Sequence, residues 1–335
     1  MKEMMLGIMA SMFFAVTFIL NRSMELSGGS WLWSSSLRFL FMVPFLVLIV
    51  MVRRNMKQVL SEMWKNPLPW LLWSFVGFVL FYAPITYAAA YGPGWLVAGT
   101  WQLTIVAGTL LGPLFMKEVI TNSGAVKVRQ KIPFRSLFIS LFILCGVILI
   151  QIPNAEGMSV NMIMSGIIPV VIAAFCYPLG NRKMMEVVDG RLDTFQRVFG
   201  MTIATVPIWL LIASAGFIDA GLPSSSQVLQ SLIVAISSGI VATILFFIAT
   251  DMVRNHHGKL ASVEATQSTQ VLFVMAGEIL IFSAPLPAAS ALFGIGVIVI
   301  GMVLHSLNQA GMGKLRSMNE AAGSDDTRQS LPFQK

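Results

Sequence analysis

Long apolar blocks separated by short polar gaps run along nearly the whole chain. We place ten of them, at 4–21, 31–52, 68–88, 94–116, 134–152, 160–180, 196–217, 228–250, 260–283 and 287–307. An apolar helix of about 20 residues crosses the ~30 Å hydrocarbon core of a bilayer, and backbone groups inside lipid must be satisfied within such a segment. The pattern therefore predicts an all-α membrane protein with about ten transmembrane helices.

Basic residues lie in the polar gaps, and mostly in alternate gaps. The gap between the second and third blocks, for example, holds Arg53, Arg54, Lys57 and Lys65. Because cytoplasmic loops carry an excess of Lys and Arg, this alternation predicts a multi-pass protein of the cell (inner) membrane with both termini in the cytoplasm. The net charge of +7 is then a topology signal, and we expect no nucleic-acid partner.

Short motifs recur between the two halves of the chain. Residues 18–24 (Phe-Ile-Leu-Asn-Arg-Ser-Met) and 178–184 (Pro-Leu-Gly-Asn-Arg-Lys-Met) each end an apolar block. An Arg follows in the next block of each half, as Arg38 and Arg197. These matches indicate an internal repeat with a shift of about 160 positions, as expected when a chain is built from two similar structural units.

The fourth and ninth blocks also share a Gln-x-Thr motif, at 102–104 and 267–269. We therefore divide the chain into an N-terminal five-helix repeat, 1–152, a C-terminal five-helix repeat, 153–310, and a disordered cytoplasmic tail, 311–335. Because five is odd, the second repeat would start from the opposite side of the membrane. Two inverted halves can tilt either way around a site at the midplane, an arrangement typical of secondary transporters.

This layout, with Asn21-Arg22 after the first block, Arg38 in the second and Gly277-Glu278 late in the ninth, resembles the drug/metabolite transporter superfamily. The similarity covers about residues 4–310 and is greatest to the multidrug resistance efflux branch. It implies a plasma-membrane carrier that exports drugs or metabolites, often driven by the proton gradient. The small multidrug resistance members of that superfamily keep a Glu in their first span, whereas block 4–21 has no carboxylate. Their exchange mechanism therefore does not transfer directly.

Two carboxylates inside the apolar blocks, Glu264 and Glu278, are candidates for proton coupling. A charged side chain in hydrocarbon costs roughly 3 kcal/mol or more, so such residues usually have a function. Glu264 shares a helix face with Gln267, and a carboxylate beside an amide suits a proton or cation site. The alternative is an interfacial Glu264 paired with Lys259 or a nearby Arg. Glu278 occupies a position typical of the family that the sequence resembles, and its alternative role is an anchor near the outer headgroups.

Arg38 lies about seven residues into the second block. It can hold an anionic substrate group, pair with a carboxylate such as Glu278, or snorkel outward. We expect His305 to be interfacial. The two cysteines, Cys145 and Cys176, lie within apolar blocks and are predicted to be plain buried residues.

Aromatic and amide side chains supply the remaining substrate-binding candidates. Tyr82 and Trp101 can hold an organic cation by cation–π attraction, or they can simply pack or face lipid. Gln102 and Gln267 lie in the repeat-related fourth and ninth blocks, which we expect to line a central cavity.

These features favour a proton-coupled secondary transporter that exports a small molecule, possibly an organic cation, by alternating access. The alternatives are a facilitated carrier of metabolites or lipid-linked substrates without proton coupling and, less favoured, an intramembrane enzyme. The sequence lacks the His-Glu-x-x-His, Gly-x-Ser-x-Gly and nucleotide-binding loop motifs. We therefore expect no enzymatic activity, cofactor or metal, and a monomer or homodimer surrounded by membrane lipid.

Overall fold

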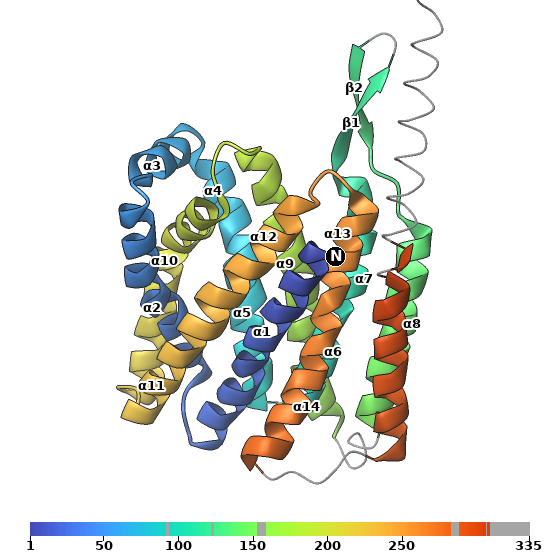
Figure 1. Cartoon of the computed structure of the whole chain (residues 1–335). Coiled ribbons are helices and arrows are strands. Elements are labelled where there is room, and N and C mark those ends of the chain that lie inside the picture. Colours follow the sequence, from blue (N-terminus) through green and yellow to red (C-terminus); the bar gives the residue numbers. More distant parts are fainter. Residues whose placement is uncertain (92–93, 122–123, 153–158, 283–287, 306, 309–335) are drawn as a thin grey trace, which may run out of the picture.

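A computed structural model describes residues 1–91, 94–121, 124–152, 159–282, 288–305 and 307–308, and in these ranges the chain is a helical bundle with one protruding hairpin (Figure 1). The first half contains α1 (Lys2–Leu26), α2 (Trp31–Val52), α3 (Met56–Lys65), α4 (Pro67–Ser74), the π-helical η1 (Phe75–Val79), α5 (Leu80–Tyr91), α6 (Gly94–Trp101), α7 (Leu103–Leu110), the 3-10 turn η2 (Gly112–Leu114), β1 (Met116–Thr121), β2 (Gly124–Arg129) and α8 (Phe134–Gln151).

The second half is almost entirely helical. It contains α9 (Val160–Val188), α10 (Thr194–Ala220), α11 (Ser225–Val234), the π-helical η4 (Ala235–Ala242), α12 (Thr243–Met252), α13 (His257–Ala265), the 3-10 turn η5 (Thr266–Ser268) and α14 (Thr269–Phe282). A last apolar helix spans Ala289–His305. The predicted tail, 311–335, lies outside the described residues.

Six of the described helices are long and apolar enough to cross a membrane. They are Lys2–Leu26, Trp31–Val52, Pro67–Tyr91, Met164–Val188, Thr194–Ala220 and Ser225–Met252, and shorter apolar helices follow at Leu96–Leu110, Phe134–Ile150 and Ala289–His305. Large apolar side chains such as Ile218 (84% exposed) and Phe138 (74%) point outward. An apolar exterior of this extent is suited to lipid, which makes the chain a multi-pass membrane protein.

The surface also corrects the prediction for the cysteines. Cys145 is exposed on α8 and Cys176 is half-buried on α9, so neither is a core residue. Their apolar neighbours in the sequence face lipid as well as protein, and composition alone does not separate the two environments.

A two-stranded hairpin, β1–β2, projects beyond one end of the bundle (Figure 1). The strands are antiparallel, with Met116 opposite Arg129 and Thr121 opposite Gly124. The predicted fourth block ran to residue 116, but α7 ends at Leu110, where Gly112 and Pro113 form a 3-10 turn. Proline lacks the backbone N–H and its ring clashes with the preceding turn, so the helix stops there.

The helices pack in a reciprocal pattern. Helix α2 packs along α10; α1 crosses η4 and α12, while α9 crosses η1 and α5. The interrupted helices α6–α7 and α13–α14 meet near the centre, and α8 contacts helix 289–305 through the facing glycines Gly146 and Gly294. The first helix of each half therefore packs against the third helical segment of the other half.

Gly77 and Gly180 allow η1 and α9 to cross at close range. A Cβ atom added to Gly180 of α9 would lie 2.3 Å from the Gly77 Cα atom in η1 and 2.4 Å from its nitrogen. Backbone atoms cannot move aside as a flexible side chain can, so only glycine fits this contact.

We predict that Gly180→Ala lowers the thermal midpoint of the purified protein in detergent, because overpacking against backbone costs about 1–3 kcal/mol. The matched control is Gly296→Ala, since a Cβ atom at Gly296 would meet nothing within 4 Å. Equal midpoints for the two variants, measured by fluorescence-detected unfolding, would contradict the close crossing.

Candidate functional site

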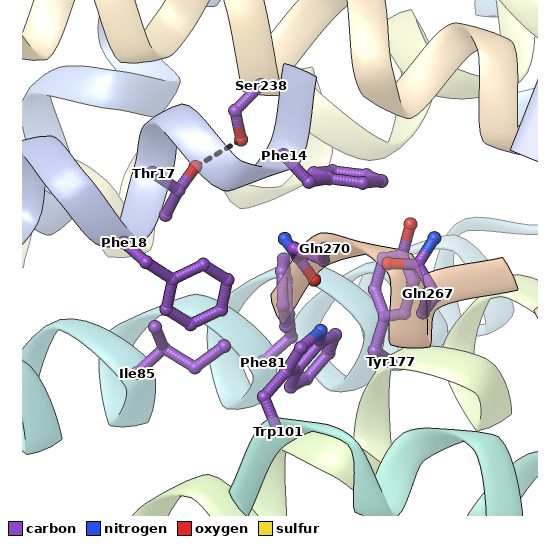
Figure 2. A pocket seen from close by; sticks show the side chains of 10 residues that line it. All are labelled: Phe14, Thr17, Phe18, Phe81, Ile85, Trp101, Tyr177, Ser238, Gln267 and Gln270. Carbon is purple, nitrogen blue, oxygen red and sulfur yellow. Dashed lines mark hydrogen bonds between the residues drawn. The ribbon is translucent and has the colours of Figure 1, made fainter. Parts of the chain in front are cut away.

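A small cavity lies where the central helices of both halves meet (Figure 2). The lining residues come from α1 (Phe14, Thr17, Phe18), α5 (Phe81, Ile85), α6 (Trp101), α9 (Tyr177), η4 (Ser238), η5 (Gln267) and α14 (Gln270). Its volume is about 10 Å³, counted as the space open to the centre of a water-sized sphere. This is room for about one water molecule, so the structure holds the cavity nearly closed.

Aromatic side chains make up five of the ten residues that line the cavity. The Phe81 ring centroid lies 4.6 Å from that of Tyr177 and 5.1 Å from that of Trp101, and Phe14 meets Tyr177 edge-on at 6.4 Å. Rings at these separations attract one another and present flat apolar faces. The wall is therefore suited to the apolar or aromatic body of a small solute.

Three polar side chains of the lining carry buried atoms without a hydrogen-bond partner. They are the Tyr177 hydroxyl, the Gln267 amide nitrogen and the Gln270 amide oxygen. A buried polar atom left unpaired costs about 1–3 kcal/mol, so such atoms are uncommon in native interiors. Their gathering around one cavity indicates a place where polar groups of a ligand are accommodated.

The π-helical segment η4 places Ser238 at the cavity edge. Its wider turn is seen in the bond from the Thr243 hydroxyl to the Ser238 carbonyl, five residues back, at 3.0 Å. The Ser238 hydroxyl accepts hydrogen bonds from Thr17 of α1 (Figure 2) and from the Arg38 Nη2 atom of α2, at 3.1 Å for the latter. One hydroxyl thus joins three helical segments, and π-helical turns are frequent at functional sites.

Arg38 is buried, with 1% of its surface exposed, directly behind this edge. Its guanidinium carbon lies 3.9 Å from the Tyr82 ring centroid, 5.1 Å from Phe39 and 5.9 Å from Phe81. Among the described residues no carboxylate forms an ion pair with it, and its Nε and Nη1 atoms have no hydrogen-bond partner. Neither the predicted snorkelling nor a carboxylate pairing is therefore seen in the described part of the chain.

Of the predicted substrate-binding residues, Trp101 and Gln267 line the cavity. Tyr82 and Gln102 are fully buried but do not. The Tyr82 hydroxyl bonds Asn21 at 3.3 Å while Arg38 lies over its ring, and the Gln102 amide nitrogen donates to the Ala98 carbonyl at 3.0 Å. The ring face expected to hold an organic cation already holds Arg38.

Glu264 lies one helical turn from Gln267 and is fully engaged in a buried ion pair. Arg182 of α9 donates from Nε to Oε1 at 2.9 Å and from Nη2 to Oε2 at 2.6 Å, with side chains 3% and 4% exposed. This two-pronged geometry is the strongest form of the interaction. Gly108 of α7 makes room for it, because an added Cβ atom would lie 1.9 Å from Oε2.

This pair corrects two predictions. Arg182 lies past the predicted end of block 160–180, among the basic residues expected in the cytoplasm, but α9 continues to Val188 and carries the side chain into the protein. Glu264 is therefore neither interfacial nor paired with a loop residue. His305, expected at the interface, is also buried: its ring bonds Ser140 at 3.3 Å and Ser262 at 3.0 Å. The side chain of Glu278, in α14, lies outside the described side chains.

Most of the cavity lining was missed at the sequence level. Phe14, Thr17 and Phe18 share one face of α1, and Tyr177 and Ser238 come from α9 and η4. On an apolar helix, aromatic and hydroxyl residues that pack against other helices recur with the same period as those that bind a ligand. Sequence periodicity therefore does not distinguish the two roles. Only the three-dimensional arrangement brings the three helices together.

A polar layer closes the bundle at the end that carries α3. Arg53 bonds Asp193 at 2.9 Å, and Glu62 of α3 accepts from Lys65 and Arg191 at 3.1 Å each. These hydrogen bonds hold the pKa of the Glu62 carboxyl below its usual range. The contacts tie α3 to the α9–α10 connection.

A second and larger space, about 280 Å³, lies between the start of α1, α14 and helix 289–305. Its lining is apolar apart from Thr269, with residues such as Met1, Met4 and Met302. It offers no set of converging polar groups, so we take the central cavity as the candidate site.

We predict that Glu264→Gln strongly destabilises the fold, since removing one partner of a buried pair typically costs about 3–5 kcal/mol. The double variant Glu264→Gln/Arg182→Gln should recover part of the loss, because it leaves no unpaired charge. A double-mutant cycle of unfolding midpoints measures this coupling. Additive losses would show that the pair does not act as a unit.

Comparisons with known proteins cover nearly the whole chain. YjlA of Bacillus subtilis, an uncharacterized protein, is 60% identical over 306 residues, which are 91% of this chain and 94% of YjlA. An uncharacterized 42.1 kDa protein of Shouchella clausii, from the intracellular alkaline protease 3' region, is 56% identical over 268 residues, covering 80% of this chain and 70% of that protein.

One solved crystal structure shares the fold, with a TM-score of 0.67 over 92% of this chain and 98% of that one at 14% identity. The family model described as "EmrE: Putative multidrug resistance efflux transporter" matches residues 1–311. The chain therefore belongs to this multidrug resistance efflux transporter family of the drug/metabolite transporter superfamily.

Proposed function

We propose that the protein is a secondary transporter that moves a small organic solute out of the cell through the central cavity by alternating access. The observation that carries this proposal is the cavity itself. Helices of both chain halves line it, aromatic rings wall it, and unpaired polar atoms face it. Such a site between two halves can open to either side when the halves tilt.

Several features support an inverted repeat of two five-helix halves, 1–152 and 153–310. The π-helical segments start at Phe75 and Ala235, 160 positions apart, and the fourth helical segments of both halves break at their Gln-x-Thr motifs. Asn21 bonds Tyr82 as Asn181 bonds Thr250, each at 3.3 Å. Reciprocal packing of α1 and α9 on the opposite halves is what a pseudo-two-fold axis in the membrane plane produces.

The proposed orientation puts the N-terminus, α3 and the hairpin on the cytoplasmic side. Figure 1 shows α3 and the hairpin at one end of the bundle, and α1 begins in the half of the bundle nearer that end. The basic residues of the polar gaps then lie inside, as in other inner-membrane proteins. The layer joining Arg53 to Asp193 and Glu62 to Arg191 would form a cytoplasmic closure that separates when the cavity opens inward.

Glu264 is the proposed proton-coupling residue. Protonation would remove the charge that holds Arg182, and Gln267 at the cavity lies on the same face one turn away. A proton arriving at Glu264 would thus alter the site. A carrier without proton coupling is the second candidate, favoured by the fact that Arg182 already occupies both carboxylate oxygens.

We predict that purified protein in liposomes catalyses exchange of a radiolabelled solute from a panel of organic anions, neutral compounds and cations. Trp101→Ala should reduce the rate at least about tenfold, because losing a buried aromatic contact of ~1.4 kcal/mol or more changes an equilibrium by that factor. The control is Cys145→Ser, an exposed site away from the cavity. If no panel member exchanges faster than in protein-free liposomes, the transporter proposal fails.

Proton coupling has its own readout, a pH-sensitive dye trapped in the same liposomes. We predict that substrate addition moves protons in the wild type and not in Glu264→Gln, compared at a temperature where the variant remains folded. Solute exchange without any proton movement in the wild type would support the uncoupled carrier instead.

A further inference from the structure

We propose that Arg38 is the charge-recognition residue of the central site and that the transported solute is a small organic carboxylate with an aromatic or apolar body. This inference rests on the proposed transport function and specifies its substrate class. It begins from the unbalanced charge of Arg38, which the fold buries beside the cavity without a carboxylate among the described residues.

A buried guanidinium cannot escape its charge by losing a proton, because arginine stays protonated in proteins. Partial compensation comes from the Tyr82 and Phe39 rings and from the Ser238 hydroxyl. Two of its nitrogens, Nε and Nη1, still have no partner. Retaining an uncompensated charge at such a place is costly, and in membrane proteins it marks a substrate or ion pathway.

The second half of the chain shows what a balanced counterpart looks like. Arg197, the arginine of the matching block in the second half, lies one turn into α10 and so nearer the helix start than Arg38 does in α2, and its guanidinium lies 4.7 Å from the Phe247 ring centroid. Its Nη1 atom bonds the Asp251 carboxylate at 2.7 Å. Arg38 has similar aromatic support from Tyr82, but among the described residues no carboxylate pairs with it as Asp251 pairs with Arg197.

Two cavity residues connect Arg38 to the site. Ser238 lines the cavity and accepts a hydrogen bond from Arg38 Nη2. Phe81 also lines the cavity, and its ring centroid lies 5.9 Å from the Arg38 guanidinium carbon. Widening the cavity past Ser238 would bring a solute anion to the free nitrogens.

The other unpaired groups fit the same solute. The Tyr177 hydroxyl and the Gln267 amide nitrogen can donate to a carboxylate, and the Gln270 amide oxygen can accept from a hydrogen-bond donor on the solute body. None of the described residues that line the cavity is a carboxylate, and Glu264 is neutralised by Arg182. The site therefore has a net positive charge, which disfavours organic cations. One guanidinium balances one charge, which favours a carboxylate over a dianionic phosphate.

The test compares three ligands of similar shape, phenylacetate, phenylacetamide and phenethylamine, with inorganic phosphate as a fourth probe. Binding to the detergent-purified full chain is measured by calorimetry and by the shift in unfolding midpoint. We expect phenylacetate to bind at least tenfold more tightly than the amide or the amine, and phosphate alone to be weaker than phenylacetate. This comparison needs no variant.

Arg38→Gln should weaken phenylacetate binding at least tenfold and change amide binding less than twofold. Arg54→Gln is the matched control, since it makes the same change at an exposed residue just past the end of the same helix and should leave both affinities unaltered. Equal or tighter binding of the amine, phosphate binding equal to phenylacetate, or an unchanged phenylacetate affinity in Arg38→Gln would each overturn the assignment.

Failure of this inference is separable from failure of the transport proposal. If the liposomes exchange neutral or cationic solutes but show no preference for phenylacetate, the protein is a transporter and the carboxylate assignment is wrong. If phenylacetate binds through Arg38 but no solute of any charge is exchanged, the anion site stands and the transport proposal falls.

Discussion

Charges inside a bundle that faces lipid must be balanced within the protein, and this constraint organises the structure. Water is not available at the outer surface to solvate them, so each buried guanidinium needs a carboxylate or another polar partner. Arg182 has Glu264, and Arg197 has Asp251. Each pair joins helices that are distant in sequence, which ties α9 to α13 and α10 to α12.

The position of the Arg182–Glu264 pair links this constraint to the cavity. It fills the space that Gly108 leaves on α7, and it lies next to the break in the α13–α14 segment at Thr266–Ser268. The helix break presents Gln267 to the cavity rather than continuing the regular hydrogen-bond ladder. A charge-balanced ion pair thus lies beside the cavity, while polar atoms of Tyr177, Gln267 and Gln270 in the cavity lining have no hydrogen-bond partner. Under the proposed function, these unsatisfied groups would bind the polar groups of the transported solute.

The sequence was sufficient for the helices because their signal is strong and local. The prediction of 31–52 coincides with α2, and the other blocks each contain a helix of the described chain, since about twenty apolar residues in succession have few alternatives in a membrane protein. The hairpin at 116–129 was missed because the apolar run before it continued past Leu110. There a proline turn, rather than hydrophobicity, ends the helix.

The site could be predicted only in part. Trp101 was identified from its aromatic ring and Gln267 from the repeat, and both line the cavity. Arg182 lies just past the predicted block 160–180, where basic residues are read as topology signals, so its ion pair was not predicted. Its partner Glu264 is 82 positions away in the sequence, so the pairing depends on the tertiary fold. The same holds for Arg38: its place in an apolar block was evident, but the absence of a described carboxylate beside it depends on how α2, α5 and η4 pack.

The central claim is that this cavity opens alternately to the two sides of the membrane. The chain has two cysteines, Cys145 and Cys176, so a cysteine-free background carrying Thr17→Cys gives one reporter on the cavity wall. We would measure its labelling by a membrane-impermeant thiol reagent in right-side-out and inside-out vesicles, beside Ser140→Cys as a buried reporter outside the cavity. The account predicts labelling of Thr17→Cys from both sides and none of Ser140→Cys. Labelling of Thr17→Cys from one side only, or from neither, would contradict it.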